Sequence, residues 1–314
     1  MFDVAFTTGG VILVVLVWLS VLHTTLVPTR SSRMAAWTAR GCVLTGSIAV
    51  RALPPRYRKR VMDLCMPVSL FVMAAGWLAG LALGFALLVG AFGWTSGTLQ
   101  VNGVVIALIG TALASAMLVA AAFAAYLIRF MEAFGRREEM ISRSAPQVQR
   151  ATDADALVAS YLRCGTRDSL DSYFAEWADW LADVHDSHIR YPGLVYTRSP
   201  GTLSWTEAAM AAMDAAALVE SVAPRWAPVH TRALLNAGSC CLQGLARSVG
   251  IELPTLLVSL QGREERAFGD TMQLAIDSGL PAERDIDHAW MAFQEIRVRY
   301  APYAVLIGAR VPGP

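Results

Sequence analysis

Residues 101–128 read VNGVVIALIGTALASAMLVAAAFAAYLI, a run of 28 residues without one charged side chain. A helix rises about 1.5 Å per residue and needs about 20 apolar residues to cross about 30 Å of hydrocarbon. Two further runs of this kind precede it, at about residues 6–27 and 64–92. The sequence therefore predicts three membrane spans near the N-terminal end of the chain.

Charge divides the chain into two parts. Only 16% of its residues are charged, whereas soluble domains carry about 25%. Residues 1–130 hold two acidic side chains, Asp3 and Asp63, and the remaining 23 follow residue 130. We predict an all-α fold with a transmembrane domain at 1–130, a helical extension and linker at 131–150, and a helical cytoplasmic domain at 151–314.

The orientation follows from the basic residues. The loop 29–63 carries eight basic residues against Asp63 alone, a net charge of +7, while the connection 93–103 carries no charge. Basic loops stay on the cytoplasmic side. The first run lacks a basic n-region and an A-x-A cleavage site, so we expect a retained helix rather than a signal peptide. The N-terminus is expected outside, and the C-terminal domain in the cytoplasm, of a multi-pass inner (plasma) membrane protein.

The basic loop also has an amphipathic pattern. Basic residues and Ser47 share one helical face, while Met34, Trp37, Leu44 and Ile48 share another. This pattern is typical of a helix in the headgroup plane, which would end at Pro54-Pro55 before a polybasic stretch. The predicted contacts to anionic lipid headgroups are Arg33, Trp37, Arg40, Arg51, Arg56, Arg58, Lys59 and Arg60. The alternative is a loop that only sets the topology.

Small residues mark possible helix-packing faces. Gly76, Gly80 and Gly84 recur every four residues in the second span, and Gly110 and Ala114 lie beside a small-residue face in the third. Such faces allow close helix approach in lipid. We expect spans two and three to pack against each other or against a second copy, and a dimer through the glycine face rivals a tetramer.

Local signals predict a series of helices after residue 150. Ser204-x-x-Glu207 is a capping box, and Pro254 and Pro281 suit first turns. Glycines suit helix ends at Gly165, Gly250 and Gly279. The predicted helices lie at about 153–163, 168–189, 205–221, 227–248, 254–261, 264–278 and 282–299.

Aromatic and apolar residues in the second of these helices recur at helical spacing. They are Tyr173, Phe174, Trp177, Trp180 and Leu181. A stripe of this kind predicts a buried core face rather than a cofactor site.

Few residues suggest chemistry. His185 and His188, with Asp186 between them, could contribute to a metal site, but two histidines three residues apart are a weak pattern. The odd number of cysteines and their spacing argue against a disulfide framework, and Cys240-Cys241 has no basic neighbour to activate it. We predict no catalytic residues, no cofactor and no enzyme activity. The acidic C-terminal part argues against nucleic acid as a partner.

Several stretches together resemble a bacterial family of ion-channel-like membrane proteins named as potassium channels. They are residues 22–30 (LHTTLVPTR), 126–130 (YLIRF), 134–138 (FGRRE), 186–199 (DSHIRYPGLVYTRS) and Ser204-Trp205. The resemblance covers nearly the whole chain. Its most specific part is the pattern formed by Asp186, His188, Tyr191, Pro192, Leu194, Tyr196, Arg198 and Ser199.

The family's selectivity filter is missing. Its members place a pore helix and a T-x-G-[YF]-G filter between spans two and three, where carbonyl rings replace the water of a potassium ion. A re-entrant helix with a filter needs on the order of 25 residues, and residues 93–103 offer 11. The filter residues therefore cannot be carried over to this chain.

Three hypotheses remain. The first is a non-conducting regulatory, sensory or assembly subunit, as a homo-oligomer or with channel-family subunits. The second is an ion channel with a non-standard pore lined by the third span, which offers Thr111, Ser115 and Tyr126 as polar residues. The third is a membrane-anchored metal-binding protein or enzyme centred on His185 and His188.

Overall fold

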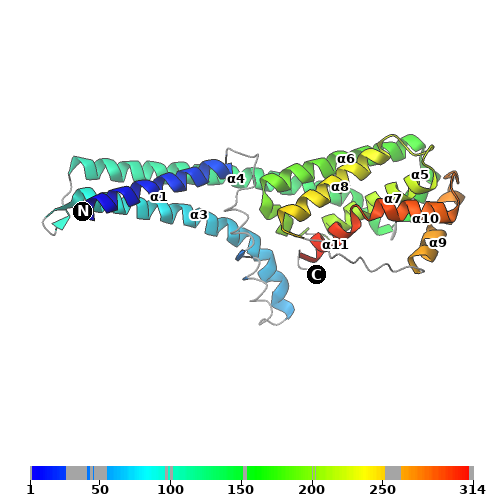
Figure 1. The fold of residues 1–314 in the computed structure, drawn as a ribbon, viewed down its shortest axis with the longest axis horizontal. Coiled ribbons are helices and arrows are strands. Elements are labelled where there is room, and N and C mark those ends of the chain that lie inside the picture. Colours follow the sequence, from blue (N-terminus) through cyan, green and yellow to red (C-terminus); the bar gives the residue numbers. More distant parts are fainter. Residues whose placement is uncertain are drawn as a thin grey trace. The chain divides into compact units, whose positions relative to one another are not determined.

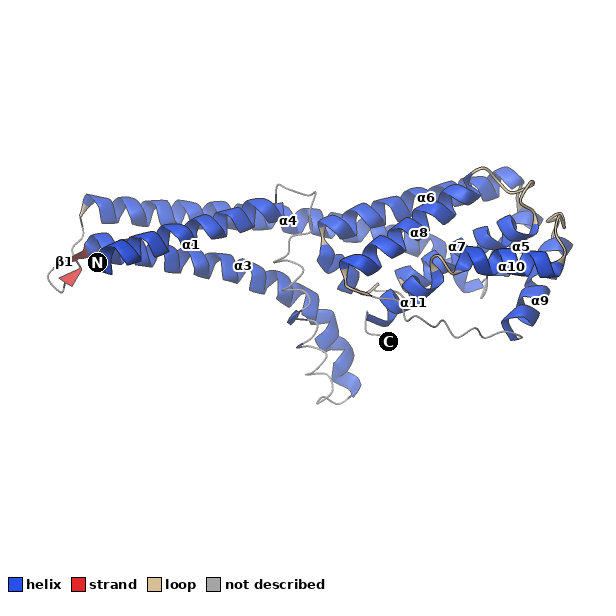
Figure 2. Cartoon of the chain, in the orientation of Figure 1, coloured by secondary structure: helices blue, strands red, loops and turns tan. Residues whose placement is uncertain are grey.

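The fold is all-α, as predicted. The structure is a computed structural model that describes residues 2–25, 41–42, 45, 55–95, 98–99, 102–150, 154–199, 201, 203–251 and 263–310. The described elements are helices except for one pair of two-residue strands (Figure 2). The chain forms two compact units: unit 1 is Met1–Glu132 with Ile189–Tyr196, and unit 2 is Ala133–His188 with Thr197–Pro314.

Three long helices are apolar enough to cross a membrane, which agrees with the three predicted spans. They are α1 (Phe2–Thr25), α3 (Pro55–Gly93) and α4 (Gly103–Arg150) (Figure 1). Large apolar side chains on all three are exposed, among them Leu19, Phe71 and Leu113. Removal of a large apolar side chain from water is favourable by about 1.5–3 kcal/mol. Side chains exposed in this number therefore suit a lipid environment rather than water.

Two of these helices extend beyond the predicted spans. Helix α3 begins at Pro55, so the stretch Arg56–Arg60, expected after a helix end, forms its first turns instead. Proline suits this position because a first-turn N–H has no helical acceptor. Helix α4 continues to Arg150 through Pro146, where a linker was expected. Helix α4 therefore belongs to both units, with residues up to Glu132 in unit 1 and residues from Ala133 in unit 2.

The connection between α3 and α4 is a tight hairpin. Strand β1 (Trp94–Thr95) pairs antiparallel with β2 (Thr98–Leu99), with Trp94 opposite Leu99. The Asn102 side chain accepts a hydrogen bond from the Val105 N–H at 2.9 Å and donates one to the Phe92 carbonyl at 3.2 Å. Asn102 thus ties the end of α3 to the start of α4, and the described residues of this connection form no pore helix.

The glycine face of α3 packs against α1, a partner that the sequence analysis did not name. A Cβ at Gly80 would lie 2.7 Å from Val17 Cγ2, and one at Gly84 would lie 2.7 Å from Val14 Cγ2. Trp77 donates a hydrogen bond to Ser20 Oγ across the same pair of helices at 3.1 Å. Side chains at these two glycines would separate the helix backbones, so glycine allows their close approach.

The other small residues have no such contact within the described part of unit 1. No atom lies within 4 Å of a Cβ built at Gly76 or Gly110. Ala114 is exposed on α4. Gly110 and Ala114 of the third span are therefore uncovered there.

Unit 2 is built around a buried helix, α7 (Trp205–Val222). Around it lie α5 (Ala154–Cys164), α8 (His230–Ser248), α10 (Ile286–Arg297) and α11 (Ala301–Arg310). Helices α6 (Arg167–Arg190) and α9 (Arg263–Asp277), with the end of α4, complete the described helices of unit 2. Many small alanines on α7 let its neighbours approach closely.

The local signals in this unit gave mixed results. The capping box is confirmed, since Glu207 N–H donates to Ser204 Oγ at 3.2 Å and Ser204 N–H donates to the Glu207 carboxylate at 2.9 Å. The aromatic face of α6 is buried, as predicted. Helix α11 was not predicted, and the helix expected at 254–261 lies outside the described residues.

The α1–α3 packing can be tested with one matched pair of substitutions. Gly84→Leu should lower the free energy of unfolding of unit 1 by about 1–3 kcal/mol, because the added side chain meets Val14. Gly76→Leu, which meets open space, is the control. Unfolding of purified protein in mixed micelles, followed by circular dichroism, measures both. Equal losses for the two variants would contradict the packing.

Candidate functional site

Within the stretch 186–199 the chain passes from unit 2 to unit 1 and back to unit 2. Its first residues end α6, and its centre forms a short 3₁₀ helix, η1 (Pro192–Tyr196). Residues 189–196 belong to unit 1, while the residues on both sides belong to unit 2. We call residues 186–199 the signature segment.

Within unit 1, the centre of the signature segment packs on α3 and α4. The Tyr191 ring lies 5.3 Å from the ring of Tyr126 and 6.1 Å from that of Phe130, both edge-on. A Cβ at Gly193 would overlap the methyl group of Met66 on α3. Edge-on aromatic pairs add about 0.5–1.5 kcal/mol each beyond the burial of their area. Gly193 thus lies in close contact with the end of the Met66 side chain.

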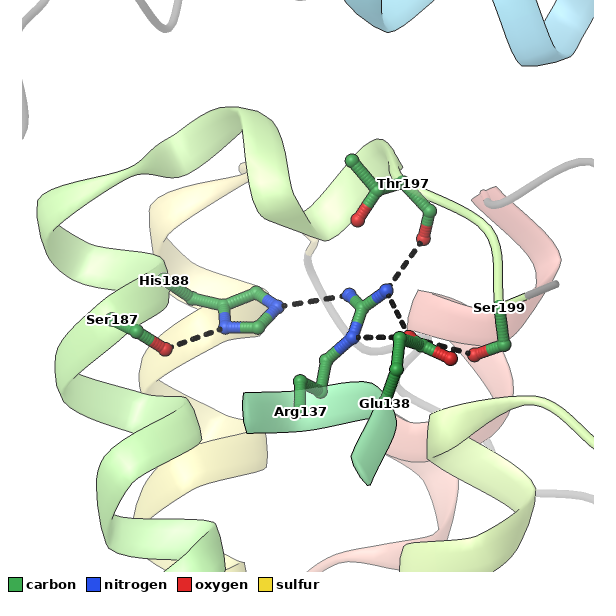
Figure 3. A network of polar contacts seen from close by, with 6 residues as sticks. All are labelled: Arg137, Glu138, Ser187, His188, Thr197 and Ser199. Atoms are coloured by element: carbon green, nitrogen blue, oxygen red, sulfur yellow. Dashed lines mark hydrogen bonds and ion pairs between the residues drawn. The ribbon is translucent and has the colours of Figure 1, made fainter. Parts of the chain in front are cut away.

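Within unit 2, α4 buries a charged side chain. The side chain of Arg137 is 1% exposed, although that of its neighbour Arg136 is 55% exposed. Arg137 donates from Nε and Nη2 to Glu138 Oε1, at 2.9 and 2.7 Å, and from Nη2 to the Thr197 carbonyl at 3.3 Å (Figure 3). Its guanidinium also lies 5.1 Å from the centre of the Phe134 ring.

Glu138 connects this cation to the end of the signature segment. Its side chain is 14% exposed, and its Oε1 also accepts a hydrogen bond from the Ser199 hydroxyl at 3.1 Å. A desolvated charge is tolerated only when it is paired and hydrogen-bonded. The arrangement satisfies that condition with acceptors from α4 and from the segment that follows η1.

His188 is a second buried polar group beside Arg137, and its hydrogen-bond geometry shows which ring nitrogen carries the hydrogen. Nδ1 lies 2.8 Å from the Val184 carbonyl, which can only accept, so Nδ1 carries the hydrogen. Nε2 then accepts from Arg137 Nη1 at 3.5 Å. Burial, together with the positive charge of Arg137, lowers the pKa of His188 to about 3. The imidazole is therefore neutral at ordinary pH.

The other signature residues differ in their burial. Pro192 and Leu194 are buried, Tyr196 and Arg198 are half-buried, and Asp186 is exposed. The signature segment thus has a packed centre and polar ends, and these ends form hydrogen bonds with Arg137 and Glu138.

Sequence reasoning missed the α4 half of this site. It included residues 134–138 as part of the resemblance and gave Arg137 no role in a site, yet a periodic signal was available. The buried residues along this face of α4 recur every three or four positions: Tyr126, Phe130, Ala133, Arg137 and Ile141. Arg137 occupies a core position in that stripe.

The metal candidates are not brought together. Both ring nitrogens of His188 have protein partners. His185 packs against Gly244, and Asp186 is exposed. Among the described residues, no group of three His, Cys, Asp or Glu side chains is placed to hold a metal ion. Cys241 is buried, which raises the pKa of its thiol.

The predicted lipid contacts divide into two sets. Arg33, Trp37, Arg40 and Arg51 lie outside the described residues. The other four lie in the first turns of α3: Arg56, Arg58, Lys59 and Arg60.

Comparison of the chain with protein-family models, with curated proteins and with solved structures gave no match. The argument about function therefore rests on the residues and their geometry.

Removal of the buried cation should be far more costly than removal of its exposed neighbour. Arg137→Met should lower the free energy of unfolding of unit 2 by about 3–5 kcal/mol, because it leaves Glu138 without its partner. Arg136→Met removes only a surface pair with Asp183 and should cost less than about 1 kcal/mol. Urea unfolding in detergent, followed by tryptophan fluorescence, compares them. Similar losses would show that Arg137 is solvated.

Acid should destabilise unit 2 through His188. Its folded pKa of about 3 lies below the ordinary value of 6.5, so between these values the unfolded chain binds the extra proton. Stability should then fall as the pH drops below 6.5, by up to about 1.4 kcal/mol per pH unit from this group. The same urea unfolding, repeated from pH 7 to pH 4, measures the slope.

His188→Gln provides the control, because glutamine keeps an acceptor for Arg137 but does not titrate in this range. The difference between the two proteins in the slope of unfolding free energy against pH gives the contribution of His188, because the carboxylates contribute equally to both. Identical slopes would mean that His188 is accessible to protons in the folded state.

Proposed function

We propose that this protein is a non-conducting membrane subunit, with a regulatory, sensory or assembly role, related to the bacterial potassium-channel-like family that its sequence resembles. The observation that carries the proposal is that α4 contacts the signature segment at two places. Tyr126 and Phe130 contact Tyr191, and two turns further along α4, Arg137 and Glu138 bind residues on both sides of η1. A helix with a membrane-spanning part thereby contacts the most specific part of the resemblance.

The short α3–α4 connection supports the absence of conduction. The β1–β2 pairing and the hydrogen bonds of Asn102 occupy residues between Gly93 and Gly103. A filter needs main-chain carbonyls that turn towards a central axis over a pore helix, and this hairpin has no length for one.

The orientation and location belong to the same proposal. We place the N-terminus outside and unit 2 in the cytoplasm of the inner membrane. The support is the net charge of +7 in residues 29–63 and the basic residues that follow the third span.

We propose two kinds of partner. Anionic lipid headgroups suit the basic residues of the 29–63 loop. A second copy, or a channel-family subunit, suits the small face at Gly110 and Ala114, which is uncovered within the described part of unit 1. Nucleic acid is not among the partners that we propose.

The geometry gives less support to the two alternatives. A pore lined by the third span would need water-facing polar groups, yet Ser115 and Tyr126 are buried within unit 1. The Thr111 hydroxyl donates to the Ala107 carbonyl at 2.8 Å. A metal enzyme centred on His185 and His188 lacks a third ligand among the described residues.

Single-channel recording tests the proposal. Purified protein in planar bilayers should show no potassium-selective current steps, because no carbonyl ring is available to replace the ion's water. A filter-bearing potassium channel reconstituted in the same way is the control for the method. Potassium-selective steps from this protein alone would refute the proposal.

A further inference from the structure

Helix α3 consists of two physically different parts. Pro67 lies inside it, where proline removes one i→i−4 hydrogen bond and commonly kinks a helix. Ser69 adds a hydrogen bond from its hydroxyl to the Met66 carbonyl at 2.7 Å, a second feature that bends helices. Figure 1 shows that α3 changes direction along its length. We call Pro55–Met66 the basic arm and Pro67–Gly93 the span.

The basic arm carries the charge that the span lacks. It contains Arg56, Arg58, Lys59 and Arg60 against Asp63, a net charge of 4 − 1 = +3, whereas Pro67–Gly93 contains no charged residue. Each basic side chain near an anionic leaflet adds favourable electrostatic energy that falls off within a Debye length. The position of the arm should therefore depend on the charge of the membrane surface.

Met66 lies at the junction of the arm and the span and contacts the signature segment. It is buried, and the Ser69 hydroxyl lies 3.5 Å from its Sδ. Its methyl group lies 2.2 Å from the position that a Cβ of residue 193 would take, and Phe130 lies 3.5 Å from the same position. The packed contact between Met66 and Gly193 is the route by which a change at this end of the arm can reach η1.

The chain leads directly from η1 to the buried cation. One residue after η1, the Thr197 carbonyl accepts from Arg137, and two residues later the Ser199 hydroxyl donates to Glu138. The residues that satisfy the Arg137 charge therefore follow η1 directly in the chain.

We propose that the basic arm of α3 is a lipid-responsive lever: anionic headgroups hold the arm, and Met66 transmits its position through Gly193 to the signature segment. This inference rests on the proposed function, in that it supplies a ligand class and a route for regulation. The ligand is the headgroup of a membrane phospholipid rather than free phosphate, because a bilayer surface presents many charges beside one arm.

Hydrogen–deuterium exchange on the full chain in vesicles tests the lever. Vesicles of phosphatidylcholine alone are compared with vesicles that contain phosphatidylglycerol, and peptides from residues 189–199 are followed. Phosphatidylglycerol should slow their exchange at least about threefold, since an anchored arm keeps Met66 against Gly193. Inorganic phosphate added to the neutral vesicles should have no effect.

Variants separate the lever from general stability. Met66→Ala should abolish the lipid effect, and Met66→Leu should retain it. Met131→Ala, which truncates an exposed methionine on α4, should behave like the native protein. Neutralisation of the arm by Arg56→Gln, Arg58→Gln, Lys59→Gln and Arg60→Gln together should also abolish the effect.

An absent lipid effect in the native protein would overturn the inference. So would an effect that persists in Met66→Ala or in the neutralised arm, or one that phosphate reproduces. These results would not contradict the proposal of a non-conducting subunit. Potassium currents would refute that proposed function, and the lipid response could still be measured.

Discussion

A guanidinium buried in a helical core needs acceptors for its N–H groups, and Arg137 finds them on α4 itself and in the signature segment. Glu138 supplies the counter-charge, while His188 and the Thr197 carbonyl supply further acceptors. An unpaired charge at 1% exposure would cost several kcal/mol. The fold around the end of α6 is therefore constrained to deliver these groups together.

This constraint explains why residues far apart in sequence act as one site. Helix α4 contributes to both units: its contacts with Tyr191 lie in unit 1, and its contacts with His188 lie in unit 2. The signature segment is held at its centre by aromatic packing and at its ends by charge. Its centre also contacts Met66, at the end of the basic arm of α3 for which we propose a response to lipid charge.

Composition and periodicity were enough to predict the three apolar helices, since lipid-facing stretches depend on local hydropathy. The capping box at Ser204 and the aromatic core face of α6 were equally local. For the glycine face, the third span or a second copy was expected and α1 was missed, because Gly80 and Gly84 show that a neighbour is close but not which one. Arg136 and Arg137 are indistinguishable by type, and only tertiary packing makes one a surface charge and the other a core charge.

A double-mutant cycle on Arg137 and Glu138 tests the central claim most directly. Arg137→Met, Glu138→Gln and the double variant are compared by urea unfolding of unit 2 in detergent. A buried, mutually dependent pair predicts that the double variant loses less stability than the sum of the single losses, by about 2 kcal/mol or more. Additive losses, within about 0.5 kcal/mol, would contradict the account.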